Sequence, residues 1–160
     1  MEEFSFEEWQ ARDQATRAAG NVRGRHFTTY ADEVKQLKRS GDNLAAITLI
    51  YECIDAAEAQ TRQETEDDIW RAEQATVPGS FARAMLEGGH APTVLGGNVP
   101  PGWYEMAAVI HRKAGDREAE IAVLERYIAQ TRRLHPDNKI ATRLRKLLEK
   151  SQPPPAIEPA

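Results

Sequence analysis

Apolar side chains recur at helical spacing in several stretches of the chain, and turn residues separate these stretches. Tyr30, Val34 and Leu37 follow one another at positions i, i+4 and i+7, which places them on one face of a helix. Gly41-Asp42 ends this stretch. A second apolar face follows, made of Leu44, Ile47, Ile50 and Ile54. We therefore expect a hairpin of two antiparallel helices over residues 28–76, with a long second helix.

The same order of features occurs again further along the chain. An aromatic pair and small residues precede a second Gly-Asp turn, and another apolar face follows it. The members of this second copy are Trp103, Tyr104, Ala107, Ala108, Gly115, Asp116, Ile121 and Leu124. The pattern predicts a second helical hairpin over residues 103–135, and stacked hairpins of this kind are typical of proteins that hold partners.

The remaining segments predict two flanking helices. Ser5 and Glu8 form a capping-box pattern, so we expect an N-terminal helix over residues 1–20 that ends with Gly20 in the left-handed conformation. Residues 136–150 predict a C-terminal helix, which begins at Pro136-Asp137-Asn138. Its apolar stripe is Ile140, Leu144, Leu147 and Leu148.

The connecting segments contain turn and loop residues. Residues 23–26 read as a loop, and Thr28 or Thr29 is the expected N-cap of the helix that follows. Residues 77–102 are rich in Gly and Pro, and we expect a long loop with a short helix that starts at Ser80 and uses Phe81, Met85 and Leu86. The same loop is a candidate lid. Residues 151–160 contain three successive prolines and predict a disordered tail.

The two hairpins resemble tetratricopeptide repeats. Residues that fit the family's pattern are Tyr30, Leu37, Gly41, Asp42, Ala46 and Cys53 in the first copy, and Tyr104, Ala107, Ala108, Gly115, Asp116 and Leu124 in the second. The chain departs from it at Glu120 and Tyr127, at Glu33-Val34, and in spacing, because Gly115 follows Gly41 by 74 residues. The standard period is about 34 residues. The resemblance implies a single all-α domain over residues 1–150, stacked as a short solenoid.

The resemblance also implies a function. Its concave face commonly binds an extended peptide or a helix, and the protein is expected to be an adaptor without catalytic, metal or cofactor sites. An acidic partner is favoured, because Lys35 and Lys38 lie at i, i+3 on this face. The alternative is that these lysines are ordinary solvated charges. Aligning the turns assigns the groove to Lys35, Lys38, Glu105, Val109 and Arg112.

Charge is distributed unevenly. The formal net charge is −4, but residues 1–80 carry 9 basic and 16 acidic side chains, whereas residues 81–160 carry 12 basic and 9 acidic ones. The excess of basic residues after Tyr127 suggests an alternative function, nucleic-acid binding through residues 126–150. The candidate patch is Arg132, Arg133, Lys139, Arg143 and Lys146. The acidic chain as a whole and the near absence of aromatic residues there argue against this alternative.

Other candidate chemistry is weaker. Residues 64–68 hold four carboxylates, which could bind a hard cation. The more ordinary interpretation is that they form a solvated face of the helix. The four histidines lack metal-ligand spacing. Cys53 is the only cysteine, and we interpret it as a small core residue of a cytoplasmic protein without a membrane span. Trp9, Trp70 and Trp103 are candidate exposed anchors of a homodimer, with packing inside its own repeat as the alternative for Trp103.

Overall fold

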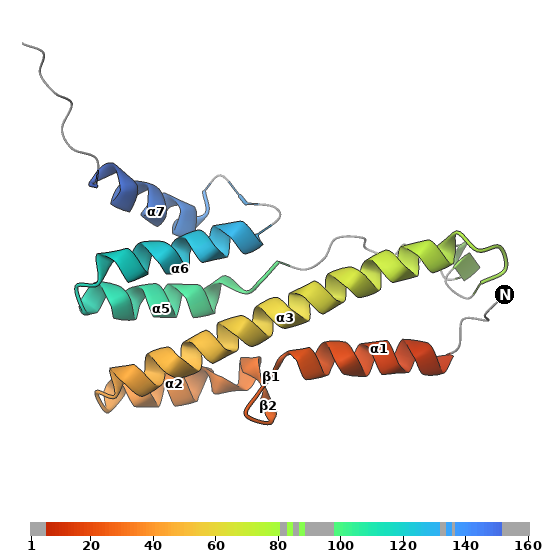
Figure 1. The fold of residues 1–160 in the computed structure, drawn as a ribbon, viewed down its shortest axis with the longest axis horizontal. Helices are drawn as coiled ribbons and strands as arrows, with labels where there is room; N and C mark the ends of the chain where they lie inside the picture. Colours follow the sequence, from red (N-terminus) through yellow and green to blue (C-terminus); the bar gives the residue numbers. More distant parts are fainter. Residues whose placement is uncertain are drawn as a thin grey trace, which may run out of the picture. The chain divides into compact units, whose positions relative to one another are not determined.

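The computed structural model describes residues 6–80, 83–84, 87–88, 98–131, 134–135 and 137–151. Helices make up most of these residues, as the apolar spacing predicted (Figure 1). The chain divides into two compact units, 1–100 and 101–160, and each is described by itself. Several predictions lie outside the described residues. These are the cap at Ser5, the side chains Phe81, Met85 and Leu86, most of the candidate lid, and the tail beyond Ser151.

The first unit is built on one long helix. Its elements are α1 (Phe6–Ala19), strands β1 (Asn21–Val22) and β2 (Arg25–His26), the 3₁₀ helix η1 (Phe27–Tyr30), α2 (Ala31–Arg39) and α3 (Asn43–Ala75). Helix α3 has 33 residues and is about 50 Å long. Helix α2 lies along the first half of α3, and α1 lies along its second half (Figure 1).

The segment between α1 and α2 differs from the sequence prediction. Residues 23–26 are part of an antiparallel β-hairpin, not an irregular loop, with Asn21 paired to His26 and Val22 to Arg25. Arg23 and Gly24 form the turn with φ values of 49° and 86°, the left-handed geometry that two-residue hairpin turns require. Glycine is the usual residue at a positive φ, and Arg23 occupies one of the two turn positions instead. The turn was therefore not recognised in the sequence.

Two capping predictions for the same region were wrong. His26, not Thr28 or Thr29, caps the first turn, because its ring accepts a hydrogen bond from the Thr28 N–H and η1 precedes α2. Gly20 follows the end of α1 but does not have a positive φ. Gly20 instead lies against two side chains: a Cβ atom there would lie 2.6 Å from His26 Nε2 and would also clash with Gln60 Oε1, so these side chains would have to move.

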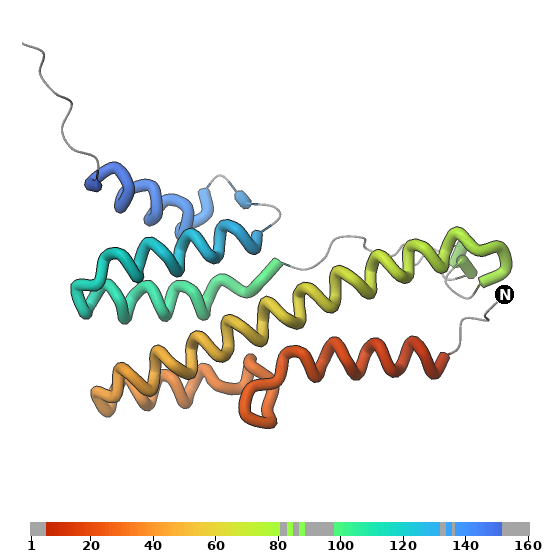
Figure 2. The backbone as a smooth tube through the Cα atoms, viewed as in Figure 1, coloured from red at the N-terminus to blue at the C-terminus, as the bar shows by residue number. Residues whose placement is uncertain are grey.

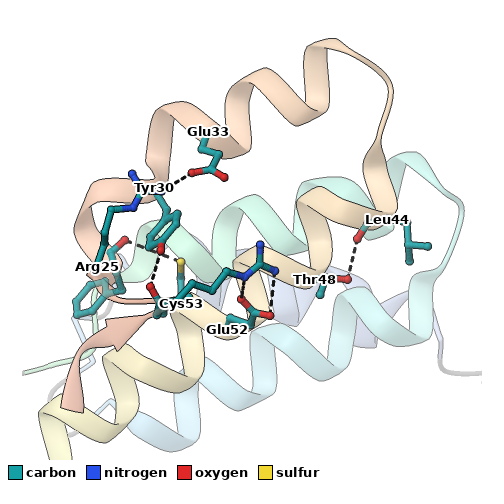
Figure 3. A network of polar contacts seen from close by, with 10 residues as sticks. Arg25, Tyr30, Glu33, Leu44, Thr48, Glu52 and Cys53 are labelled. Carbon is teal, nitrogen blue, oxygen red and sulfur yellow. Dashed lines mark hydrogen bonds and ion pairs between the residues drawn. The ribbon is translucent and has the colours of Figure 1, made fainter. Parts of the chain in front are cut away.

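The core of the first unit lies between η1, α2 and the first half of α3. Tyr30, Val34, Ile50 and Cys53 are all buried there. The Tyr30 hydroxyl donates a hydrogen bond to the Val22 carbonyl, which ties the β-hairpin to this core (Figure 3). At the surface of the same region, Arg25 donates to Glu33 at 2.6 Å.

Helix α1 is attached to α3 by polar contacts. None of the residues of α1 is buried, whereas Asp67 of α3 is only 1% exposed. Thr16 donates a hydrogen bond to one Asp67 oxygen, and Arg12 lies 3.4 Å from the other. The Arg12 guanidinium also lies over the Trp70 ring, 4.2 Å from its centroid. The interpretation of residues 64–68 as a solvated face is therefore wrong for Asp67.

The second unit consists of three successive helices, α5 (Pro101–Lys113), α6 (Arg117–Gln130) and α7 (Lys139–Glu149). The chain reverses direction between α5 and α6 and again between α6 and α7 (Figure 2). Asn138 caps α7 by accepting hydrogen bonds from the N–H groups of Ile140 and Ala141, which agrees with the predicted start of the last helix. Tyr104 and Tyr127 meet edge to face, with ring centroids 5.2 Å apart.

The two Gly-Asp turns have the same structure. Gly41 and Gly115 have φ values of 80° and 75°. Asp42 accepts a hydrogen bond from Ala45 N at 3.0 Å, and Asp116 accepts the equivalent bond from Ala119 N at 3.0 Å. Each turn therefore ends one helix with a left-handed glycine and caps the next with an aspartate.

The buried positions of the two hairpins also correspond. With the sequences aligned on the turns, six buried positions of the first hairpin match six buried positions of the second. They are Tyr30, Val34, Ala46, Leu49, Ile50 and Cys53, which match Tyr104, Ala108, Glu120, Val123, Leu124 and Tyr127 in that order. The predicted repetition is thus present as two hairpins with the same buried face.

Candidate functional site

The predicted groove residues belong to different units. Lys35 and Lys38 lie on α2, and Lys35 forms an exposed ion pair with Asp32 at 3.5 Å. Glu105, Val109 and Arg112 lie on α5. Arg112 and Glu105 are exposed, and Val109 is half-buried. Because each unit is described by itself, the groove built from both hairpins remains a prediction.

The second unit contains a hollow of about 290 Å³ beside the turn that joins α5 to α6. Five cationic side chains line it, Arg112, Arg117, Arg143, Lys146 and Lys150. Gly115, Glu120 and Leu147 complete the lining. We call this hollow the basic pocket. Its cations come from the last turn of α5, the first turn of α6, and the middle, last turn and C-cap of α7.

Two contacts between α6 and α7 shape the basic pocket. Arg143 donates two hydrogen bonds to the Glu120 carboxylate, at 2.9 and 3.2 Å. Arg117 donates a hydrogen bond to the Leu147 carbonyl near the end of α7. The helices run antiparallel, so these contacts fix both ends of the lining and bring Lys146 and Lys150 to the same side as Arg117.

Charge in the basic pocket is unbalanced. The side chain of Glu120 is only 3% exposed and pairs with Arg143. Hydrogen bonding to Glu120 raises the pKa of Arg143. Arg112, Arg117, Lys146 and Lys150 form no ion pair with a carboxylate of the described residues. Among the residues that the structure describes, the four positive charges around the hollow thus have no carboxylate partner.

The helix dipole accounts for only part of this arrangement. Cations in the last turn of a helix interact favourably with its negative end, which suits Arg112 and Lys146. Arg117 lies in the first turn of α6, where the dipole disfavours a cation. The cluster is thus more than a set of helix-terminal charges.

The structure combines residues from both predicted sites. Arg112 was assigned to the peptide groove, and Arg143 and Lys146 to the nucleic-acid patch, yet all three line the basic pocket. Lys139 lies at the first residue of α7 and does not line it. Arg132 and Arg133 lie outside the described residues.

Sequence reasoning did not assign Arg117 to a site, and it placed Lys150 only within the basic region 126–150 of the nucleic-acid alternative. Arg143, Lys146 and Lys150 lie at i, i+3 and i+7, which is the spacing of one helix face. That spacing was the available signal for Lys150. Nothing in the sequence near Arg117 indicates its contact with Leu147, which is 30 residues away.

The first unit has a second hollow, of about 300 Å³, beside the β-hairpin turn. Arg23 and Glu52 line it and form an ion pair with each other at 2.8 and 3.0 Å (Figure 3). Asp55 also contributes to its lining. Because its one cation is already paired, this hollow offers less to a charged ligand than the basic pocket does.

Cys53 and the possible metal ligands were the remaining candidates for site chemistry. Cys53 is fully buried, and burial raises the pKa of its thiol to about 12. A thiol with such a pKa is a poor nucleophile at neutral pH. In the part of the chain that the structure describes, no group of three or more His, Cys, Asp or Glu side chains is arranged to hold a metal ion.

Comparison of the chain with protein-family models, with curated proteins and with solved structures gave no match in any of the three. Among the described helices, none combines the length and the apolar character needed to cross a membrane.

Proposed function

We propose that this protein is a binding protein that holds an acidic segment of a partner protein in the basic pocket of its second unit. One observation carries the proposal. Four cationic side chains from three helices surround a hollow of about 290 Å³, and none of them is paired with a carboxylate of the described residues. Charge-assisted hydrogen bonds to carboxylates are stronger than neutral ones, so such a hollow favours an anionic ligand.

The repeated hairpin supports this class of function. Two turns with the same capping bonds and six equivalent buried positions agree with the proposed likeness to tetratricopeptide repeats. Helical repeats of that kind present surfaces to partner proteins. When the two hairpins are aligned on their Gly-Asp turns, Arg112 corresponds to Lys38. Both hairpins therefore carry a cation in the last turn of their first helix.

The pocket's lining favours a peptide over nucleic acid. Base stacking on aromatic side chains contributes much of the affinity for single-stranded nucleic acid. None of the described residues that line the basic pocket is aromatic. Nucleic-acid binding is therefore the less favoured function of this pocket.

The test is affinity capture from a nuclease-treated lysate with three baits. These are the wild type, the pocket variant Arg112→Glu with Lys146→Glu, and the control Lys139→Glu with Arg145→Glu. The control changes net charge equally at two exposed positions outside the pocket. We expect mass spectrometry to identify a protein that the wild type and the control retain and the pocket variant loses.

Two results would overturn the proposal. One is a set of captured proteins that is the same for the wild type and the pocket variant. The other is capture that occurs only when the nuclease is omitted, together with salt-sensitive retention of DNA or RNA by the wild type. That result would support the nucleic-acid alternative.

A further inference from the structure

We infer that the ligand group of the basic pocket is a phosphate monoester, as in a phosphorylated serine or threonine of the partner. This inference rests on the proposed function and specifies the anion that the same pocket takes. Three features of the pocket support it: the number of its charges, the three helices that supply them and the size of the hollow.

The pair formed by Glu120 and Arg143 shows what one carboxylate requires in this pocket. A single guanidinium supplies both hydrogen bonds, one to each carboxylate oxygen. Four further cations remain around the hollow. A ligand carboxylate has one negative charge and two oxygens in one plane, so it would leave most of these cations unmatched. A phosphate monoester has a charge of about −1.5 to −2 at neutral pH and three terminal oxygens.

The origin of the cations on three different helices also favours phosphate. Arg112 comes from α5, Arg117 from α6, and Lys146 and Lys150 from the C-terminal end of α7. Donors that approach from three helices suit a tetrahedral group whose oxygens point in different directions. Lysine is a point charge without a planar fork, and it commonly contacts phosphate in this way.

The size of the hollow fits a phosphorylated side chain. The hollow has a volume of about 290 Å³, close to the lower end of the range for ligand pockets in proteins. A free ion would leave much of this space to solvent, whereas a phosphorylated side chain would fill more of it, and Leu147 in the lining offers an apolar contact for its methylene group. The absence of aromatic side chains from the described lining makes a nucleotide base a poorer fit.

The inference is tested on the full chain with three randomised peptide libraries that differ only at a fixed central residue, which is phosphoserine, glutamate or serine. Binding is measured by fluorescence anisotropy. We expect the phosphoserine library to bind about tenfold more tightly than the glutamate library, as one added charge-assisted hydrogen bond would produce. The variant Arg112→Gln with Lys146→Gln should lose this difference, and the control Lys139→Gln with Arg145→Gln should keep it.

The outcomes separate the two proposals. Equal binding of the phosphoserine and glutamate libraries would overturn the phosphate inference and leave the acidic-segment function standing. No binding of either library would overturn both. Inorganic phosphate is a separate probe, followed by NMR at the amides of Gly115, Arg117 and Lys150. If inorganic phosphate binds as tightly as the phosphoserine library, the pocket binds the free ion. The proposal that the phosphate belongs to a phosphorylated peptide would then be wrong.

Discussion

Arg143 of α7 binds Glu120 of α6 through two hydrogen bonds, although Glu120 occupies the position at which the first hairpin has Ala46. Ala46 and Glu120 are both buried. In the first hairpin a small residue occupies this position. In the second, a third helix covers it and supplies the cation that a buried carboxylate needs. This exchange of residue type thus adds an ion pair to the contacts between α6 and α7, and the pair lines the basic pocket.

Replacing Arg143 by alanine should lower the free energy of unfolding more than replacing Glu120 does. Arg143→Ala leaves a buried carboxylate without its cation, and we expect it to lower the free energy of unfolding by about 3 kcal/mol. Glu120→Ala leaves Arg143, which is 36% exposed and retains access to water, so the expected loss is about 1 kcal/mol. Urea denaturation of both single variants and the double variant measures their coupling. A larger loss for Glu120→Ala would contradict this account.

Gly20→Ala should destabilise the first unit. The new Cβ atom would lie 2.6 Å from His26 Nε2 and would clash with Gln60 Oε1. It would therefore disrupt the 2.6 Å hydrogen bond that joins these two side chains. We expect a loss of about 1–3 kcal/mol in thermal or urea unfolding. Gly102→Ala in α5 is the control, because nothing lies within 4 Å of its added Cβ, and it should be neutral or slightly stabilising. Equal effects would show that the packing at Gly20 is not restrictive.

Asp67→Asn should release α1 from α3. Helix α1 buries none of its residues, so its attachment depends strongly on the contacts of Asp67 with Thr16 and Arg12. Hydrogen exchange should become faster across residues 6–19 and change little in α2. Asp68→Asn is the matched control. Asp68 is half-buried and pairs with Arg71 of its own helix at 3.2 Å. Unchanged protection of α1 in the Asp67 variant would show that other contacts hold the helix.

Stability should fall at alkaline pH through Cys53. Burial raises the pKa of this thiol from 9.0 to about 12, so between these values the unfolded chain loses the proton while the folded protein keeps it. The contribution of the neutral thiol to stability is thus fully present below pH 9 and is lost as the pH rises to about 12. Tyrosines and lysines titrate in the same range, so the measured quantity is the difference in unfolding free energy between the wild type and Cys53→Ala. A difference independent of pH would contradict the prediction.

The two Gly-Asp turns should respond alike to substitution. Asp42→Ala and Asp116→Ala each remove a capping bond of 3.0 Å to a backbone N–H. We expect each to lower the free energy of unfolding by about 1 kcal/mol. A clear inequality would show that the turns are equivalent in geometry but differ in their contribution to stability.

The sequence by itself determined most of the helices, and the caps at the two Gly-Asp turns and at Asn138. The spacing of Tyr30, Val34 and Leu37 predicts α2 because one helix turn brings neighbours three and four residues apart onto one face. The Gly-Asp turns and the cap at Asn138 were predictable for the same reason, since each bond joins residues at most three apart. The β-hairpin was missed because each strand has only two residues and one of the two turn positions is Arg23.

Only the tertiary structure decided which charges are buried and which lie together. Asp67 meets Arg12 across 55 residues, and Glu120 meets Arg143 across 23. The basic pocket draws Arg112, Arg117 and Lys146 from three different helices. No local pattern encodes such contacts. A carboxylate reads the same in the sequence whether it faces water or a guanidinium, and the packing of helices determines which of the two it meets.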